Sequence, residues 1–330
     1  MSRFTDAAKV FHSLTISAME EASRTGERTL GVDHLFLALV LNEQVAGQVL
    51  RSFGVTLEAA RNAISEQHAE QLASLGVHVD MPASDHITFH NGAAYTWGHA
   101  ALEVLERASK SGNTDDASAV LRELIQEPSG MSEALLLRLN VNPTLVMERL
   151  DQHDNCIASQ CLPQDKDKLS RSAEFFVPAS PQEVWDLLSK PAKMPQWLPG
   201  VERVGEVPNK VSIGAQWETT APSKHPDGSL NKVRPELRIT RVTLTEFEEP
   251  SCIAWYFTWP QAPKTNDRHI RIRIEPAAGG AQLFLSTAWV RNTTSSKHLL
   301  LPRWVRYPIY RFALWVQIQQ LGSSISRAFR

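Results

Sequence analysis

The chain has 330 residues, of which 42% are hydrophobic and 21% charged, and its formal net charge is −2. This composition excludes a disordered or fibrous protein, and the length allows two domains that each bury a core. Three cysteines do not predict a disulfide framework, and the chain has neither a basic-then-apolar leader nor a run of about 18 apolar residues. We therefore expect a cytoplasmic protein.

The charge is divided unevenly along the chain. Residues 1–153 carry 11 basic and 20 acidic side chains, a net charge of −9, whereas residues 154–330 carry 23 and 16, a net charge of +7. The last 55 residues contain no Asp or Glu. This asymmetry predicts two modules and a basic end that would favour an acidic partner or surface.

The first half shows helical periodicity. Apolar residues Val10, Leu14 and Ala18 predict one face of a helix that begins after the cap-like "FTD". Gly26 and Gly31 interrupt the pattern, and "LFLALVLNE", "AGQVLRSF" and "TLEAARNAI" predict three more helices. We expect Gly54 to end the third of these in a left-handed conformation.

A shift of 86 residues lays this block on a second one. Val49 and Leu50 then fall on Leu135 and Leu136, and "EASRTG" falls on "RASKSG". The sequence therefore predicts an all-α domain over residues 1–152 that is built as a tandem repeat. Each copy has about four helices, and the copies lie at about residues 4–66 and 90–152.

The segments "FTDAAKVF", "LGVDHLFLAL" and "AGQVLRSFGV" resemble the Clp N-terminal domain, the double helical repeat of Clp-type chaperone ATPases. The resemblance covers roughly residues 2–152 and implies contacts with Clp-type chaperone or protease components or with client proteins. Some members of that family recognise phosphoarginine through a Thr and an acidic residue, which match Thr5 and Asp33. The family's Glu is an Asp in this chain, and the second copy lacks both residues.

Simpler roles for these residues stay open. Thr5 and Asp33 are suited to capping helices, and His34 is suited to packing at a helix start. ATP hydrolysis is excluded, because the chain contains no G-x-x-x-x-G-K-[ST] string and Gly-Lys never occurs.

Residues 153–168 are polar and aperiodic, which predicts a linker. His153, Cys156 and Cys161 could be three metal ligands, but a fourth ligand is missing and the spacing fits no zinc site. We expect no metal and no cofactor.

The second half is rich in strands. A strand in "SRSAEFFVPAS" precedes a short helix capped by Ser180, and six further strands lead to a helix from about Pro302. In "HIRIRIEP" the residues Ile270, Ile272 and Ile274 should face one way, and His269, Arg271 and Arg273 the other.

The phrases "VPASPQEVWDLLSKPAKMPQWLPGV" and "IEPAAGGAQLFLS" resemble the START-like superfamily of polyketide cyclase and dehydrase type proteins. The resemblance spans about residues 169–330. It implies an α+β helix-grip fold, in which an antiparallel sheet wraps on a long C-terminal helix around an apolar cavity. That superfamily includes cyclases, lipid carriers and receptors, so the resemblance predicts a small hydrophobic ligand without defining a reaction.

All nine tryptophans except Trp97 lie in this half. We expect ligand contacts from a set of aromatic residues and one arginine, while ordinary core packing is the alternative for any single ring. The set is Trp197, Trp217, Trp255, Trp259, Trp289, Trp304, Trp315 and Arg238, with Trp185 assigned to the core.

A catalytic role would need an acid or base that points into the cavity. Glu218, Tyr256 and His269 are candidates, and so is Arg238, although it could equally face solvent. None of them forms a recognisable dyad in the sequence.

We predict a non-ATPase adaptor or regulator that combines a protein-interaction module with a hydrophobic cup. A cyclase or dehydratase and a lipid carrier are the alternatives. The six basic residues after residue 296 alternate with aromatic residues, which is compatible with a membrane-surface helix. We expect a lid helix instead, with one face on the sheet and its arginines in water or against the acidic first domain. The same charges do not favour nucleic-acid binding, because they are spread along this helix.

Overall fold

The computed structural model describes residues 3–74, 76, 87, 95–110, 117–154, 169–208, 210–223, 231, 233–290 and 303–330. Residues 1–159 and residues 160–329 belong to two separate compact units. Among the described residues, no helix combines the length and the apolar character that a bilayer span requires.

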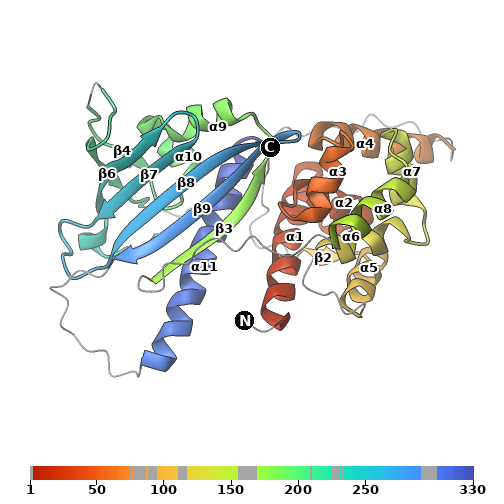
Figure 1. Cartoon of the computed structure of the whole chain (residues 1–330), viewed down its shortest axis with the longest axis horizontal. Helices are drawn as coiled ribbons and strands as arrows, with labels where there is room; N and C mark the ends of the chain where they lie inside the picture. The colour runs from red at the N-terminus through yellow and green to blue at the C-terminus, as the bar shows by residue number, and fades with distance from the viewer. Residues whose placement is uncertain are drawn as a thin grey trace. The chain divides into compact units, whose positions relative to one another are not determined.

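The first unit is helical. Within the described ranges its helices are α1 (Arg3–Thr25), α2 (Val32–Leu41), α3 (Val45–Ser52), α4 (Leu57–Ser74), α5 (His99–Lys110), α6 (Ala117–Ile125), α7 (Met131–Arg138) and α8 (Pro143–Asp154) (Figure 1). Two short strands, β1 (Thr29–Leu30) and β2 (Thr96–Trp97), pair in parallel between the two sets of helices. The helix α2 contacts α1 and α3 to α7, which explains why nearly all of its residues are buried.

The predicted internal repeat is confirmed by the positions of the helices. The helices α3 and α7 begin 86 residues apart, and so do α4 and α8. Gly54, with φ of 84°, matches Asn140, with φ of 58°, as the left-handed residue after each third helix. The residue that follows each of them makes an equivalent hydrogen bond. The Val55 backbone N–H donates to Leu50 O (3.2 Å), and the Val141 backbone N–H donates to Leu136 O (2.8 Å). The same local signal therefore ends the same helix in both copies.

The second unit is a helix-grip fold, as predicted. Within the described residues its strands are β3 (Leu169–Val177), β4 (Arg203–Val204), β5 (Gln216–Thr220), β6 (Ile239–Glu248), β7 (Cys252–Thr258), β8 (Asp267–Ala277) and β9 (Gly280–Val290). They form one antiparallel sheet in the order β3-β9-β8-β7-β6-β5-β4. The long helix α11 (Arg303–Arg327) contacts β3, β9 and α10 (Figure 1).

Short helices complete this unit: α9 (Pro181–Leu188), η1 (Pro191–Lys193), α10 (Met194–Trp197) and η2 (Pro235–Leu237). The predicted cap of α9 is confirmed, because the Ser180 hydroxyl accepts the Glu183 N–H (3.3 Å) and the Glu183 carboxylate accepts the Ser180 N–H (2.8 Å). This reciprocal pair satisfies two backbone donors at the start of the helix.

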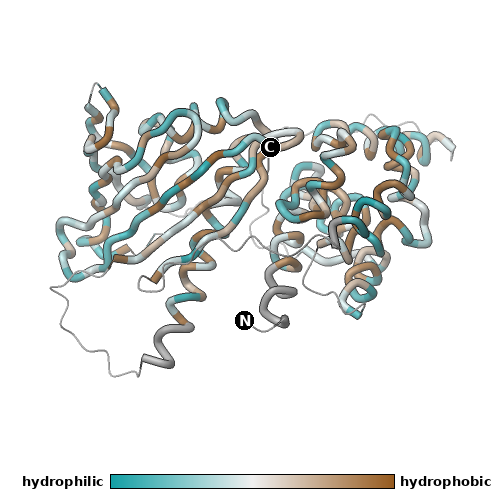
Figure 2. Tube along the Cα trace, in the orientation of Figure 1, coloured by the Kyte–Doolittle hydropathy of each residue, from teal (hydrophilic) through white to brown (hydrophobic). Residues whose placement is uncertain are grey.

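Alternating side chains give the sheet a buried inner face and an outer face. Ile270, Ile272 and Ile274 of β8 are buried, as the sequence predicted, and Figure 2 shows apolar and polar residues alternating along this strand. The helix α11 packs closely on the inner face, because a Cβ at Gly322 would meet the Phe175 ring at 2.4 Å. Glycine at this position therefore allows the helix to approach β3.

Candidate functional site

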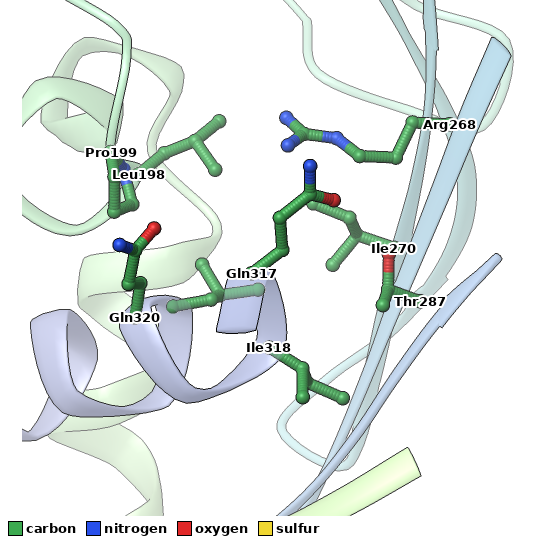
Figure 3. A pocket seen from close by; sticks show the side chains of 9 residues that line it. Leu198, Pro199, Arg268, Ile270, Thr287, Gln317, Ile318 and Gln320 are labelled. Carbon is green, nitrogen blue, oxygen red and sulfur yellow. The ribbon is translucent and has the colours of Figure 1, made fainter. Parts of the chain in front are cut away.

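A cavity of about 190 Å³ lies between the inner face of the sheet and α11, and it is partly open to solvent (Figure 3). Its apolar lining comes from five residues of the loop after α10, of β8 and of α11: Leu198, Pro199, Ile270, Ile318 and Leu321. Four polar residues complete the lining: Arg268, Thr287, Gln317 and Gln320. The site is therefore a hollow that combines apolar and polar side chains in similar numbers, and small-molecule sites combine both kinds.

Strand register explains how these side chains converge. Arg268 and Ile270 are two residues apart on β8, so both point to the inner face. Thr287 of β9 lies directly opposite Ile270. Gln317 and Leu321 are one helical turn apart on α11, which places both on the side that faces the sheet.

Arg268 carries the charge in this cavity. Its guanidinium carbon lies 4.7 Å from the centre of the Phe257 ring, so one face of the guanidinium rests on an aromatic surface. Burial lowers the pKa of Arg268 to about 10, which leaves the side chain charged at neutral pH. Among the described residues, no carboxylate forms a salt bridge with it, and its Nε atom has no hydrogen-bond partner.

Gln317 is the second polar group without a full set of partners. Its Oε1 atom is buried and has no hydrogen-bond partner in the described part of the chain. Figure 3 shows the Gln317 amide beside the Arg268 guanidinium, at the side of the cavity formed by α11 and β8. The cavity thus brings together a cationic donor and a neutral amide.

Arg268 and Gln317 were not predicted as site residues. A signal for Arg268 was present, because extending the period-two pattern of Ile270, Ile272 and Ile274 by one step towards the N-terminus gives residue 268. An arginine at an inward position is unusual enough to mark a site. Gln317 had no comparable signal, since its direction depends on how α11 is rotated against the sheet.

The tryptophans predicted to contact ligand occupy other places. Trp197, Trp217 and Trp255 are buried in the core of the second unit, with ring centres of Trp197 and Trp255 5.1 Å apart. Trp259 is partly buried against that core, and the Trp289 ring packs on Tyr310 of α11 at 5.8 Å. None of these rings lines the described cavity.

The two remaining tryptophans of that set lie on α11. Trp315 packs on Phe312 with ring centres 5.7 Å apart. The side chain of Trp304 lies outside the described residues. Trp185, assigned to the core, is buried there against Phe247 at 5.0 Å.

Three of the four catalytic candidates lie on the outer face of the sheet, away from the cavity, and the fourth precedes strand β6. Glu218 neighbours the inward Trp217, and its carboxylate pairs with Arg241 at 3.1 Å. Tyr256 and His269 are cross-strand partners, one position out of phase with the inward residues of β7 and β8. Arg238 is exposed directly after η2. None of these four residues lines the described cavity.

The side chains of Tyr256 and His269 have polar partners on the outer face of the sheet. The Tyr256 hydroxyl donates to Asp267 at 3.0 Å, and burial together with this acceptor raises the pKa of Tyr256 to about 12. His269 Nε2 lies 3.4 Å from the Thr245 hydroxyl. A phenol with so high a pKa is poorly suited to proton transfer at neutral pH.

In the helical unit, Asp33 and His34 form the start of α2. The Asp33 carboxylate accepts the His34 N–H at 2.9 Å, and His34 Nδ1 accepts the Gly31 N–H at 3.1 Å. His68 of α4 lies 3.6 Å from the same carboxylate. A Cβ at Gly31 would meet Asp33 Oδ1 at 2.3 Å, so glycine makes room for the carboxylate. These contacts lie in the first turn of α2, whose N-cap residue is Gly31, and they satisfy backbone donors there.

The pKa of Asp33 is lowered in the folded protein, so its carboxylate is charged at neutral pH at the start of α2. Burial by itself would raise the pKa of this carboxyl group, but hydrogen bonds and charge from His34, together with His68, outweigh burial and hold its pKa below the ordinary value of 3.8. Thr5, the other predicted contact residue, falls inside α1, which begins at Arg3 rather than after Thr5. Its side chain lies outside the described residues.

We expect Asp33→Ala to lower the free energy of unfolding by about 1 kcal/mol at neutral pH, because the first turn of α2 loses a carboxylate that accepts the His34 N–H and interacts favourably with the helix dipole. A carboxyl group whose pKa is lowered on folding contributes stability above its ordinary pKa of 3.8, and the contribution is lost as the pH falls through the folded value. Urea unfolding of both proteins, followed by far-UV circular dichroism, should therefore show a difference at neutral pH that closes in acid. A difference that stays constant in acid would contradict this role.

A metal site was not expected, and its candidate ligands cannot be compared with the structure. Cys156 and Cys161 lie outside the described residues, and so does the His153 side chain. In the ranges that the structure covers, no three His, Cys, Asp or Glu side chains gather as metal ligands would.

Several solved structures are similar to this chain. Protein CV1439 from Chromobacterium violaceum shares 18% identity, with coverage of 48% of this chain and 96% of that protein and a TM-score of 0.32. The di-domain ARO/CYC StfQ from the steffimycin biosynthetic pathway shares 14% identity, with coverage of 62% and 60% and a TM-score of 0.37. Protein SA2116 from Staphylococcus aureus shares 13% identity, with coverage of 48% and 92% and a TM-score of 0.37.

Family models match both halves of the sequence. Residues 168–314 match "Polyketide cyclase / dehydrase and lipid transport", and residues 3–90 match "Clp repeat (R) N-terminal domain". No sequence among the curated proteins matches the chain. The chain therefore joins a Clp repeat N-terminal domain to a domain of the polyketide cyclase/dehydrase and lipid transport family.

Proposed function

We propose that the second unit, residues 169–330, binds a small hydrophobic molecule between its sheet and α11. The observation that carries the proposal is the partly open cavity of about 190 Å³, five of whose nine lining residues are apolar. The family match supports it, since that family's description includes lipid transport. Apolar surface that a ligand covers in such a cavity drives binding by the hydrophobic effect.

The chemistry of the lining supports binding rather than catalysis. A cyclase or dehydratase needs a group that gains or loses a proton near neutral pH. The residues that line the described cavity include no Asp, Glu, His, Cys, Lys or Tyr. The predicted acid and base candidates sit on the opposite face of the sheet, where a ligand in the cavity does not reach them.

The helical unit gives the proposal its second part. We infer that it contacts Clp-type chaperone or protease components or their client proteins in the cytoplasm, because residues 3–90 match the Clp repeat N-terminal domain. The sequence carries no P-loop, so the protein would act as an adaptor or regulator whose ligand occupies the other unit. Thr5 and Asp33 are the contact residues that we propose.

Ligand-observed NMR on the full chain tests the first part. Toluene, phenylacetamide and phenylacetate are suitable probes, since each has a single ring. We expect binding that Gln320→Trp blocks, because residue 320 is an exposed part of the cavity lining. The matched control is Gln319→Trp, one position away and outside the lining, which should leave binding unchanged. If none of the three probes binds, the cavity is not a hydrophobic ligand site.

Affinity capture from the protein's own host tests the second part. We expect the full chain to retain Clp-type components, and Thr5→Ala and Asp33→Ala to reduce that retention several-fold. If both variants retain Clp-type components as well as the wild-type chain does, Thr5 and Asp33 are not contact residues, and Asp33 only stabilises the start of α2. Capture without any Clp component or client would remove the adaptor role.

A further inference from the structure

The fold alone does not explain why the Arg268 guanidinium lies in the cavity without a charged partner. Buried cations in proteins are usually paired, because removing an unpaired charge from water is costly. Arg268 is half-buried; in the described residues it has no salt-bridge partner, and its buried Nε atom donates no hydrogen bond. The Phe257 ring covers one face of the guanidinium at 4.7 Å, but the N–H groups point outward from its edge. These edges are free to bind an acceptor in the cavity.

The walls of the cavity add no negative charge. The lining residues from β9 and α11 belong to the last 55 residues of the chain, which contain no Asp or Glu. The other lining residues come from β8 and from the loop after α10, and they are equally free of acids. An anion in the cavity would therefore meet one guanidinium and no opposing carboxylate from the lining.

The size of the cavity limits the ligand. A volume of about 190 Å³ is somewhat above that of the engineered apolar cavity of about 150 Å³ that binds benzene, and below the usual range of about 300–1,000 Å³ for larger ligands. It suits one ring or a short acyl chain with a small polar group. The amide of Gln317, beside Arg268 in Figure 3, can contact that polar group as well.

We propose that the cavity binds a small amphipathic carboxylate, with its carboxylate group on Arg268 and its ring or short acyl chain against Ile270, Ile318 and Leu321. A single guanidinium matches a single negative charge, and its planar donors match the two carboxylate oxygens. The proposal rests on the proposed binding of a hydrophobic molecule and specifies the chemical class of that molecule.

Two probes of nearly the same shape test the charge. Phenylacetate and phenylacetamide differ in charge but hardly in size, and ligand-observed NMR titration of the full chain compares their dissociation constants. We expect phenylacetate to bind about 10- to 100-fold more tightly, the range for hydrogen bonds to charged groups. Arg268→Met should abolish this preference, because it should weaken phenylacetate binding much more than phenylacetamide binding.

Arg273→Met is the matched control. Arg273 lies on the same strand, and its guanidinium also rests on a phenylalanine ring, Phe284, at 4.4 Å. It faces the outer side of the sheet, where it pairs with Glu275 at 3.1 Å. This variant should keep the full preference for phenylacetate.

The outcomes separate the two proposals. Equal affinity for both probes, or a preference that survives Arg268→Met, overturns the carboxylate inference while hydrophobic binding stands. Absence of binding by either probe, and by toluene, overturns both. If Arg268→Met does not fold, Arg268→Lys replaces it; it should weaken phenylacetate binding about 10-fold, because lysine lacks the planar pair of donors.

The melting temperature of the ligand-free protein provides a second test. Arg268 is half-buried, and its Nε atom is buried without a hydrogen-bond partner, which opposes folding; Arg268→Met should therefore raise the melting temperature of the second unit, by about 2–4 °C for each kcal/mol gained. Arg273→Met removes a half-buried guanidinium whose charge is already paired with the Glu275 carboxylate, and it should not raise the melting temperature. A large fall in melting temperature for Arg268→Met alone would show a structural role in place of ligand binding.

Discussion

Gly47→Ala is expected to lower the free energy of unfolding of the helical unit by about 3 kcal/mol, despite the better helix propensity of alanine. A Cβ at this position of α3 would lie 1.9 Å from the backbone oxygen of Asn42 and 2.6 Å from Nη1 of Arg51. The Asn42 backbone oxygen cannot move aside, whereas the end of a flexible side chain could. The turn between α2 and α3 would therefore have to open.

The cost is large because a buried arginine depends on the same turn. Arg51 is only 4% exposed, and its Nη1 donates to Val40 O at 2.6 Å and to Asn42 O at 2.8 Å. These bonds satisfy carbonyl groups at the C-terminal end of α2. Burial lowers the pKa of Arg51 to about 10, so it remains charged at neutral pH. Moving Asn42 weakens this arrangement as well as the packing.

The second copy supports this connection between the two residues. At the offset of 86, Gly47 corresponds to Glu133 and Arg51 corresponds to Leu137, which is 57% exposed. Where the buried arginine is absent, the glycine is absent too. The close approach is thus a property of the first copy and not of the repeat in general.

Gly54→Ala provides the matched control for Gly47→Ala. Gly54 has φ of 84°, but nothing lies within 4 Å of a Cβ built there, so alanine should cost only about 1–2 kcal/mol through backbone strain. Urea unfolding followed by far-UV circular dichroism compares the two variants. If Gly47→Ala proved no less stable than Gly54→Ala, the close contact with Asn42 would not be what holds this turn.

Trp255→Ala is expected to destabilise the second unit by about 3–5 kcal/mol, the usual cost of removing a large buried aromatic side chain. Trp255 is 1% exposed and stacks obliquely on Trp197, which is fully buried, at 5.1 Å. Its neighbours across the sheet are Leu244 and Ile270, both buried. The empty volume left by alanine has no flexible surface side chain to fill it.

Tryptophan fluorescence is a suitable measurement, because eight of the nine tryptophans belong to residues 169–330. Trp259→Ala is the control, since Trp259 directly follows β7 and is only partly buried; we expect a cost of about 1 kcal/mol. A Trp255→Ala protein that is as stable as the control but no longer binds phenylacetate would instead make Trp255 a ligand contact, as the sequence pattern first indicated.

The parts of the fold that were predicted correctly depend on residues close together in the chain. The cap of α9 needs only Ser180 and Glu183, three residues apart. The inward face of β8 follows from alternation in a run of eight residues, and the end of α3 follows from one glycine with positive φ. Such short-range patterns are fixed by backbone geometry, which is why they could be predicted from the sequence.

The candidate site is harder to predict from the sequence, because its members come from separate elements. The abundance of tryptophan correctly indicated a large aromatic content, but not that Trp197 and Trp255 pack on each other in the core. Glu218, Tyr256 and His269 are suitable residue types that the strand register places on the outer face. Whether a residue on a strand points inward depends on the period-two phase of the strand, which an inserted residue or a bulge shifts, such as the irregularity between Leu244 and Glu246.

The sequence by itself determined the two kinds of domain, the repeat of 86 residues, the lack of a P-loop and the alternation along β8. Only the tertiary structure decided that Arg268 and Gln317 meet in one cavity and that Gly47 gives room to Arg51. It also decided that Gly322 of α11 lies against Phe175 of β3. The physical reason is range: periodicity and capping act within a few residues, whereas a cavity and its charge arise where elements distant in sequence pack together.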